Sequence, residues 1–290
     1  MSEKNRPIAF LSTDDLSGHV SDDHLAVAPL RKLGWSVEFV SWRDSLDWRQ
    51  FSAVVIRTPW DYTEDAEAFL SQLQIIEESS TPLANSLSTV RWNLDKTYLR
   101  ELSTVGLSVV PTRWLTGVSQ RELEHCAKQF QAQELVIKPQ LGAGAKDTLR
   151  LKPSQFDDQL AKLYAQRPVM IQPFLEQIVS EGEYSLFFFA GSLCHTINKR
   201  PATGDFRVQE EHGGIITAVE PSAKMIAIAN DIMQSLAEKP LYARVDLVRF
   251  QDSFALMELE LVEPSLYLRM SPQAATVFAT TIDQWLSLGK

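Results

Sequence analysis

The sequence predicts an α/β (α+β) protein with about two or three subdomains. Three features predict it: the length, alternating strands and helices near the N-terminus, and an apolar strand hairpin near the C-terminus. With 290 residues the chain exceeds one typical compact domain. Its 44% hydrophobic and 22% charged residues are ordinary for a globular protein, so we expect a sizeable buried core.

Composition limits the partners and the compartment. A net charge of -9 argues against general binding to nucleic acid or to an anionic membrane surface, because both need a basic face. Cys126 and Cys194 form neither a disulfide framework nor a CxxC metal pair. The N-terminal apolar run is too short for a signal peptide, and no membrane-spanning apolar run occurs. We expect a cytoplasmic protein without nucleic-acid or membrane partners.

The first elements alternate between strand and helix. Residues 8–12, 36–40 and 53–56 are short apolar strands, and residues 24–33 have helical spacing that Gly34 ends. This order predicts a small open α/β layer. Ligands of such sheets lie beyond the carboxyl ends of the strands, so the segment after residue 56 is the first candidate site.

That segment is Arg57-Thr58-Pro59-Trp60-Asp61-Tyr62. In one interpretation it contacts a small molecule, and Arg57 holds a carboxylate through two parallel hydrogen bonds. In the other it begins a helix over residues 64–78, with Asp61 or Thr63 as the N-cap. The two interpretations are compatible. We favour substrate contact, because strand-end loops carry function more often than helix interiors do.

A second unit begins near residue 85. Residues 90–99 open a helix that Gly106 ends, and Asn93 is the candidate N-cap. Lys96 falls in the first turn of this helix, where a lysine is ordinarily a solvated surface residue. Local sequence gives Lys96 no other role.

The stretch LVIKPQLGAGAK, residues 135–146, places a lysine at the end of a strand and directly before a loop of small residues. Backbone N–H groups of such a loop can surround phosphate oxygens, and Lys138 adds a positive charge. The stretch is neither a Walker A loop nor a GxGxxG fingerprint. A plain hairpin turn is the open alternative.

The remaining elements are mostly strands. The pattern predicts a helix over 120–130, strands over 169–175, 184–190 and 193–198, a hairpin of strands 243–250 and 254–262, and an amphipathic helix over 273–286. Residues 251–253 supply the turn of the hairpin.

Carboxylates gather on the second strand of this hairpin. Glu258 and Glu260 are two residues apart, so the side-chain period of two places both on one face, and antiparallel pairing can bring Asp246 beside them. Three carboxylates repel one another unless a cation lies among them, and oxygen ligands suit Mg²⁺ or Mn²⁺. The sequence therefore predicts a divalent-metal site. A strand with a solvated acidic face is the open alternative.

Four features occur in a fixed order: a helix lysine, a strand lysine before a small-residue loop, a strand followed by an acidic residue, and Asp…Glu-x-Glu before Pro264. In this order, residues 85–288 resemble the ATP-grasp superfamily, in particular its glutathione synthetase-like and D-alanine–D-alanine ligase-like carboxylate–amine ligases. The family's usual Glu-x-Asn is Glu258-Leu259-Glu260 here, which keeps a second carboxylate. The resemblance implies an ATP-grasp fold with a Rossmann-like N-terminal substrate domain (1–84), a lid or central subdomain (85–175) and a metal-binding subdomain (176–290).

The resemblance also implies roles for single residues. The residues implied for ATP are Lys96 and Lys138 at the phosphates, Gly142, Ala143, Gly144 and Ala145 in the loop over them, Gln172, Phe174 and Leu175 at the adenine, and Glu183 at the ribose. Those implied for one or two Mg²⁺ (or Mn²⁺) ions are Asp246, Glu258 and Glu260, and the cations implied near the γ-phosphate are Arg200, Arg207 and Arg244. A salt-bridged surface position is the alternative for Arg200.

The implied chemistry is ATP-dependent formation of a C–N bond. A carboxylate attacks ATP to give an acyl phosphate, an amine then attacks that intermediate, and ADP and phosphate are released. Because water would destroy the intermediate, we expect loops 142–146 and 203–214 to close over the nucleotide. His195 and His212 are candidate bases for the amine, although a lone histidine is more often structural.

The substrates are less well defined. An amino-acid-like or small peptide substrate would suit Arg57, Trp60, Asp61 and Tyr62 of the first domain, with Tyr267 and Arg269 beyond the metal strand. Within the superfamily, the 57–62 loop, the Arg-Trp-Asn-x-Asp-Lys segment and Glu-Leu-Glu-Leu-Val-Glu-Pro-Ser are most similar to the cyclo-ligases that act on O-ureido-D-serine to make cycloserine. A catalytically silent ATP-binding sensor, and a phosphotransferase or carboxylase of the same fold, are the alternatives. Relatives are commonly dimers, so a homodimer is one expectation.

Overall fold

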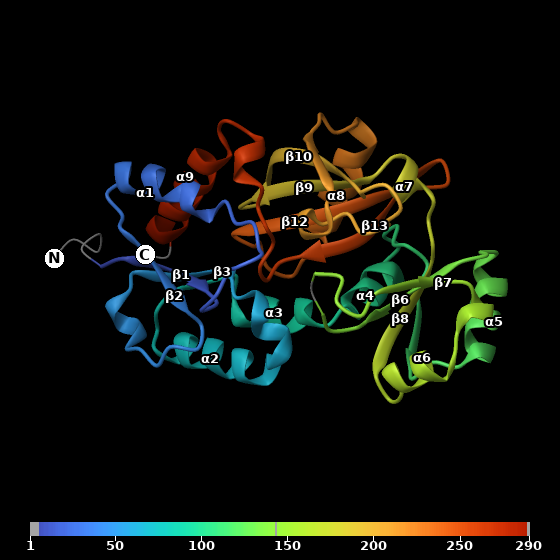
Figure 1. Cartoon of the computed structure of the whole chain (residues 1–290). Coiled ribbons are helices and arrows are strands. Elements are labelled where there is room, and N and C mark those ends of the chain that lie inside the picture. Colours follow the sequence, from blue (N-terminus) through green and yellow to red (C-terminus); the bar gives the residue numbers. More distant parts are fainter. Residues whose placement is uncertain (1–5, 143, 289–290) are drawn as a thin grey trace.

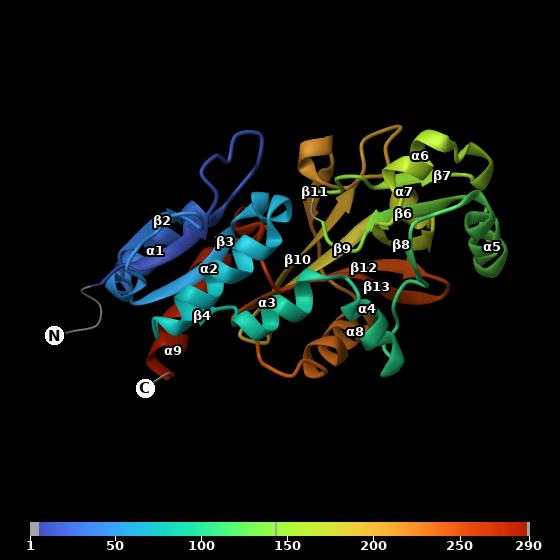
Figure 2. The ribbon, with the colours of Figure 1, turned by 90° about the horizontal axis from the view of Figure 1, so that it is seen from below.

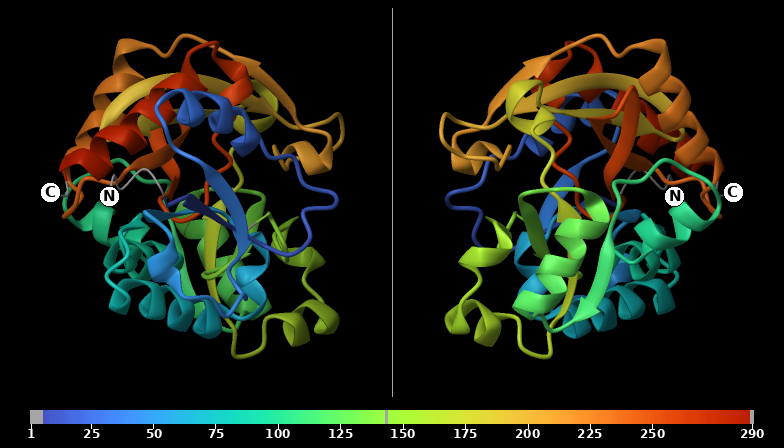
Figure 3. Two further views of the ribbon diagram at one scale, coloured as in Figure 1. Left: turned by 90° about the vertical axis from the view of Figure 1, so that its left-hand side faces the viewer. Right: turned by 90° about the vertical axis from the view of Figure 1, so that its right-hand side faces the viewer.

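The computed structural model describes residues 6–142 and 144–288. Within them the strands form one parallel and two antiparallel sheets (Figure 1). Figure 2 shows the parallel sheet at one end, the sheet of residues 113–173 at the other, and the third sheet between them. In Figure 3 the third sheet arches over the other two. The predicted α/β class is confirmed.

The first sheet has the order β2–β1–β3–β4, and all its neighbouring strands are parallel. Its strands are β1 (Ile8–Ser12), β2 (Val37–Ser41), β3 (Ala53–Thr58) and β4 (Leu83–Ala84). One face packs against α2 (Ala66–Glu78) and α3 (Leu87–Leu94), and the other against α1 (Val27–Lys32) and α9 (Ala274–Leu288). Because both faces are covered, β1 and β3 are apolar along almost their whole length.

Two expectations for the segment after β3 are wrong. The strand continues to Thr58, so Arg57 is a strand residue rather than a loop residue. The N-cap of α2 is Asp65, whose side chain accepts a hydrogen bond from the first turn of the helix. Asp61 cannot take this position, because it lies in the 3-10 turn Trp60–Glu64 and its carboxylate binds side chains next to β2.

The helix predicted over residues 90–99 is in fact two helices. Ser86 caps α3, and α4 (Tyr98–Thr104) begins after a short link. Asn93 lies in the last turn of α3 rather than at an N-cap. Its buried amide donates to the carbonyl of Leu259 at 2.9 Å and accepts from the N–H of Leu261 at 2.8 Å. These contacts with the end of β13 fix Asn93.

The second sheet is antiparallel and has the order β5–β8–β6–β7. Its strands are β5 (Arg113–Thr116), β6 (Leu135–Pro139), β7 (Leu149–Leu151) and β8 (Pro168–Pro173). The predicted helix over 120–130 is confirmed as α5 (Gln120–Phe130), which packs Leu123 and Cys126 onto the sheet; α6 (Asp158–Leu163) follows β7. The small-residue loop joins β6 to β7.

The third sheet is antiparallel and has the order β11–β10–β9–β12–β13. Its strands are β9 (Glu183–Phe189), β10 (Ser192–Arg200), β11 (Ile215–Ala218), β12 (Tyr242–Phe250) and β13 (Ser253–Glu260), which confirm the predicted hairpin. Successive residues of β9 face opposite cores. Leu186 and Phe188 pack with α4 and α8 (Ala223–Gln234), whereas Phe187 and Phe189 pack with α9.

Short helices complete the chain. They are α7 (Gln177–Ser180) and the 3-10 turns Asp23–Ala26, Trp48–Gln50, Trp60–Glu64, Pro153–Gln155, Glu210–His212 and Leu268–Met270. No helix in residues 6–142 or 144–288 combines the length and the apolar character needed to cross a membrane.

Asn85 ties the first sheet to the third. Its buried amide donates to the carbonyls of Tyr242 (3.0 Å) and Leu261 (2.6 Å) and accepts from the N–H of Leu241 at 2.7 Å. We expect Asn85→Ala to lower the free energy of unfolding by about 2–5 kcal/mol, because it leaves buried polar groups without partners. Urea denaturation measures the change. Gln74→Ala, which removes only exposed hydrogen bonds, is the control and should stay within about 0.5 kcal/mol of wild type.

Candidate active site

A cavity of about 550 Å³ lies between the three sheets. The sequence-predicted site residues that line it are Trp60, Asp61, Tyr62, Lys96, Lys138, Gly142, Gly144, Ala145, Gln172, Glu183, Arg207, Arg244, Asp246, Glu258, Glu260 and Tyr267. Ala143 lies outside the described residues. The other predicted residues, Arg57, Phe174, Leu175 and Arg200, do not line the cavity.

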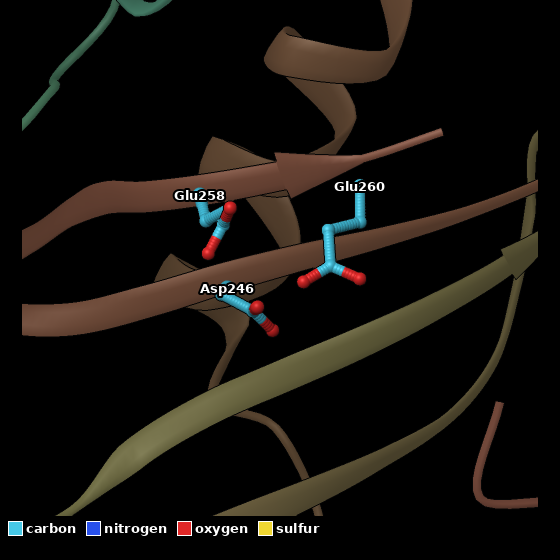
Figure 4. Close-up of side chains that lie close together, drawn as sticks. All are labelled: Asp246, Glu258 and Glu260. Carbon is cyan, nitrogen blue, oxygen red and sulfur yellow. The ribbon is translucent and has the colours of Figure 1, made fainter. Parts of the chain in front are cut away.

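Three carboxylates converge on one face of the third sheet (Figure 4). The antiparallel register pairs Asp246 with Glu258 and Arg244 with Glu260, so alternate residues of β12 and β13 point to the same side. One carboxylate oxygen each of Asp246, Glu258 and Glu260 lies within 4.8 Å of the others. The structure thus brings together the acidic side chains that the strand period places on one face.

Two buried cations surround Asp246. The guanidinium of Arg244 donates to both carboxylate oxygens of Asp246, at 2.9 to 3.0 Å, and also contacts Glu260. The Nζ of Lys199 lies 2.6 Å from a carboxylate oxygen of Glu183 and 3.5 Å from one of Asp246. Arg244 and Lys199 are only 8% and 4% exposed, so they form part of the fixed charge of the site.

The pKa values in the cluster follow from burial and pairing. Burial favours the protonated form of Asp246, but Arg244 and Lys199 outweigh it and lower the pKa of Asp246. At Glu260, burial prevails over Arg244 and, with the neighbouring carboxylates, raises the pKa to about 8. Arg244 alone therefore does not offset the burial of Glu260, and a bound cation would add positive charge there.

Two lysines reach the cavity from other elements. Lys96 lies in the link between α3 and α4, and its Nζ is 2.8 Å from Glu258 and donates to the carbonyl of Gly142 at 2.7 Å. Burial opposes the charge of Lys96, yet Glu258 holds the pKa of Lys96 above its ordinary value. Lys138, on β6, has no ion pair within the described residues. Its ammonium lies 3.4 Å from the sulfur of Met257, and burial lowers its pKa.

The small-residue loop and the segment 203–214 meet at the cavity. The Nε2 of His212 lies 3.4 Å from the carbonyl oxygen of Gly144. A carboxylate oxygen of Glu211 lies 4.0 Å from the Nδ1 of His19, which belongs to the N-terminal unit that contains the first sheet. The segment 203–214 therefore contacts both the small-residue loop and the first unit.

Arg57 points into the protein interior rather than into the cavity. It is 0% exposed, its Nε lies 3.0 Å from Asp23, and its Nη2 donates to the carbonyl of Pro264 at 2.8 Å. The geometry does not support the substrate contact predicted for Arg57, because its donors are committed to these partners.

Three other predicted residues lie outside the cavity wall. Arg200 is exposed and donates to the backbone carbonyl of Glu181 at 3.1 Å, so it lies at the surface, but within residues 6–142 and 144–288 it has no salt bridge. The ring of Phe174 lies under the guanidinium of Arg150, 3.5 Å away. Leu175 is buried in a small apolar core. The geometry gives none of these three side chains direct access to a ligand in the cavity.

The first unit contributes an aromatic side to the cavity. The Nε1 of Trp60 donates to the backbone carbonyl of Glu263 at 3.0 Å, and the Tyr62 hydroxyl, near the Glu263 carboxyl, acts to lower the pKa of Glu263. Tyr267, which follows β13, lines the same cavity. Burial raises the pKa of Glu263 to about 7.

Two cavity residues, Lys199 and Glu263, have no place in the predicted strands. β10 continues past residue 198, where the sequence predicts its end, and pairs Lys199 with Glu183. Had the predicted strand been extended to residue 199, its side-chain period of two would have placed Lys199 on the same face as Ile197. Glu263 lies beyond β13 and breaks the period of two, so no strand pattern identifies it.

Comparison with known proteins agrees with this geometry. Residues 8–85 match the family described as the N-terminal domain of D-cycloserine synthetase DcsG, and residues 100–265 match the ATP-grasp domain of prokaryotic glutathione synthetase. The chain belongs to the ATP-grasp family. As an ATP-grasp enzyme it is an ATP-dependent ligase that joins a carboxylate to an amine.

Individual relatives support this membership in the ATP-grasp family. The cycloserine biosynthesis protein DcsG of Streptomyces lavendulae is 33% identical over 275 residues, which cover 88% of this chain and 91% of the relative. The crystal structure of D-cycloserine synthetase DcsG has a TM-score of 0.84 and 30% identity over 96% of this chain and 99% of that one. D-alanine–D-alanine ligase from Bacillus anthracis complexed with ATP shares the fold, with a TM-score of 0.68 and 16% identity over 97% and 96% of the two chains. The ATP-grasp comparisons favour the ligase over the sensor, phosphotransferase and carboxylase alternatives.

His195 is a packing residue of the ATP-grasp fold rather than a base of the site. Its ring stacks on Phe187 with centroids 4.3 Å apart, and its Nε2 lies 3.0 Å from the carbonyl oxygen of Leu266. It does not line the cavity. Burial lowers the pKa of His195 from 6.5 to about 4.

We expect His195 to make stability depend on pH. The unfolded chain binds the proton near pH 6.5, whereas the folded protein resists it down to about pH 4, so the stabilisation is present above pH 6.5 and is lost as pH falls toward 4. Between pH 7.5 and pH 5, His195→Gln should therefore lose about 2 kcal/mol less of its free energy of unfolding than wild type. Urea denaturation at both pH values measures the difference. Equal losses in the two proteins would contradict the assignment.

Proposed function

We propose that the enzyme activates the carboxylate of a small amino-acid-like or peptide substrate with ATP in this cavity and joins it to an amine. The observation that carries the proposal is that Asp246, Glu258 and Glu260 converge in one cavity with Lys96 and Lys138. In this arrangement residues 1–84 supply the substrate side. Residues 85–175 and 176–290 supply the two sides of the nucleotide site.

The carboxylate cluster fits a divalent metal ion. Asp246, Glu258 and Glu260 offer only oxygen donors, all within 4.8 Å of one another, and such ligands suit Mg²⁺ or Mn²⁺. The raised pKa of Glu260, about 8, is a second indication, because a cation would favour the charged carboxylate. When bound there, the ion would neutralise phosphate charge.

The cations and the small-residue loop of the chain suit the phosphates of ATP. Lys138 presents an ammonium without a carboxylate partner among the described residues, and Lys96 reaches both Glu258 and the loop carbonyl of Gly142. The loop residues proposed over the phosphates are Gly142, Gly144 and Ala145, with Ala143 between them outside the described residues. This combination of lysines and backbone is typical of phosphate binding.

The adenosine would lie along β8 and β9. The side-chain amide of Gln172 donates to Thr112 at 3.0 Å, which orients it at the cavity wall. Glu183, held by Lys199, is the candidate for the ribose hydroxyls. Phe174 and Leu175 enter this proposal as packing behind the adenine, not as direct ligands.

The reaction brings two anions together, the substrate carboxylate and the terminal phosphate of ATP. Arg244 and Lys199 supply buried positive charge at this point, and Arg207 adds a further cation from the segment 203–214. The acyl phosphate must then be shielded from water. The contact between His212 and Gly144 makes segments 142–146 and 203–214 the proposed closing elements.

The activity is tested by phosphate and ADP release from Mg·ATP. The resemblance of the 57–62 loop to the cyclo-ligases that act on O-ureido-D-serine makes that compound the first substrate to test, followed by amino acids and dipeptides in pairs. We expect at least one acid, alone or with an amine, to stimulate release of ADP and phosphate in equal amounts. Nucleotide binding without stimulation by any acid or pair would contradict the proposed substrate class.

Removing one carboxylate of the cluster should abolish turnover. We expect Glu258→Gln and Glu260→Gln to lower kcat by about 10²-fold or more, because each loses a proposed ligand of the metal ion. Steady-state ADP release and a Mn²⁺ titration of nucleotide binding measure the effect. Glu124→Gln on the exposed face of α5 is the matched control and should stay within about threefold of wild type. Unchanged Mn²⁺ dependence in both cluster variants would contradict the metal assignment.

A further inference from the structure

Glu263 is a buried carboxylate without a cationic partner. It is 8% exposed and lines the cavity. Other buried carboxylates each have a basic group within 4.0 Å: Asp22 has Arg269, Asp23 has Arg57, Glu183 has Lys199, and Asp246 has Arg244. Across residues 6–142 and 144–288, Glu263 has none. The buried charge of Glu263 is therefore not neutralised by an ion pair within the cavity.

The first unit fixes the position of Glu263. The Nε1 of Trp60 donates to the backbone carbonyl of Glu263 at 3.0 Å, and the Nη2 of Arg57 donates to that of Pro264 at 2.8 Å. The side chain of Glu263 lines the cavity together with Tyr62. Arg57 thus acts on the site indirectly, by holding the backbone that carries this carboxylate.

The cations that line the cavity do not form an ion pair with Glu263. The charges of Lys96 and Arg244 reach Glu263, but Lys96 is paired with Glu258 at 2.8 Å and Arg244 with Asp246 at 2.9 Å. A metal ion at Glu263 would need several oxygen ligands, whereas within residues 6–142 and 144–288 Glu263 is not part of the clustered carboxylate group of Asp246, Glu258 and Glu260. A buried carboxylate is costly when it stays unpaired. A ligand cation of lower coordination number is the simplest way to remove that cost.

We propose that Glu263 binds the primary ammonium group of the acid substrate. The aromatic rings of Trp60, Tyr62 and Tyr267 line the same cavity, and such rings attract a cation placed over their faces. The inference rests on the proposed function in one respect, because it requires an acid substrate to enter this cavity. It narrows the substrate class to amino acids with a free ammonium group and excludes hydroxy acids and N-acylated acids.

Direct binding tests the assignment without requiring turnover. The 290-residue chain is saturated with Mg·ADP and titrated calorimetrically with paired acids that differ only at the ammonium group: D-serine against D-glycerate, D-alanine against D-lactate, and O-ureido-D-serine against its N-acetyl derivative. We expect at least one amino acid to bind tenfold or more tightly than its partner. Glu263→Gln should reduce that ratio to threefold or less, because it keeps the shape of the side chain and removes the charge.

Glu124→Gln is the matched control, because it removes the same charge from an exposed residue on α5, outside the cavity. It should keep the wild-type ratio within threefold. A thermal melt shows whether Glu263→Gln is folded, and its Tm should not fall below that of wild type, since the substitution removes an unpaired buried charge.

Three results would overturn the inference. They are equal binding of the paired acids to wild type, no binding of any amino acid in the panel, and an unchanged ratio in Glu263→Gln, whether or not the Mn²⁺ dependence of that variant changes. The failure of the ligase proposal looks different. Selective binding that depends on Glu263, without release of ADP and phosphate, would leave the ammonium subsite standing and remove the proposed reaction.

Discussion

The site depends on one electrostatic constraint, which is that clustered carboxylates on a buried sheet face must be neutralised. Asp246, Glu258 and Glu260 lie within 4.8 Å of one another, and each has a basic partner. Those partners come from separate parts of the chain, since Arg244 is on β12 and Lys96 is in the link between α3 and α4. The β12–β13 hairpin is thus coupled to the α3–α4 link, because loss of Lys96 would leave the buried charge of Glu258 uncompensated.

Features that depend only on the geometry of neighbouring strands could be predicted from the local sequence. The convergence of the three carboxylates is one of them, because it follows from the side-chain period of two and from a hairpin turn that the sequence identifies. The position of Arg57 was not predictable in this way. An arginine at a strand end suits a ligand or a buried ion pair equally well, and here Asp23 and the carbonyl of Pro264, 207 residues away, decide for the interior.

Helix ends show the same division. Ser86 and Asn93 are both favourable N-caps by residue type, and the local sequence favours neither decisively. The choice is made by β13, whose backbone at Leu259 and Leu261 takes both polar groups of the Asn93 amide. Long-range contacts of this kind fix Lys96 as well, since its position in a link rather than a helix lets its backbone N–H bind the carbonyl of Gln140 at 3.0 Å.

The pairing seen in the cavity also suggests why ligand entry need not be costly. Lys96 holds Glu258 and the carbonyl of Gly142, so it already bridges the acidic hairpin and the proposed phosphate loop. If a divalent cation bound Glu258 and a phosphate bound Lys96, the Lys96–Glu258 ion pair would be replaced by two new ones, and neither side chain would be left unpaired. Glu260 and Glu263, whose pKa values burial raises to about 8 and about 7, would gain most from added positive charge. An exchange of this kind keeps the buried charges neutralised and favours binding of the cation and the phosphate.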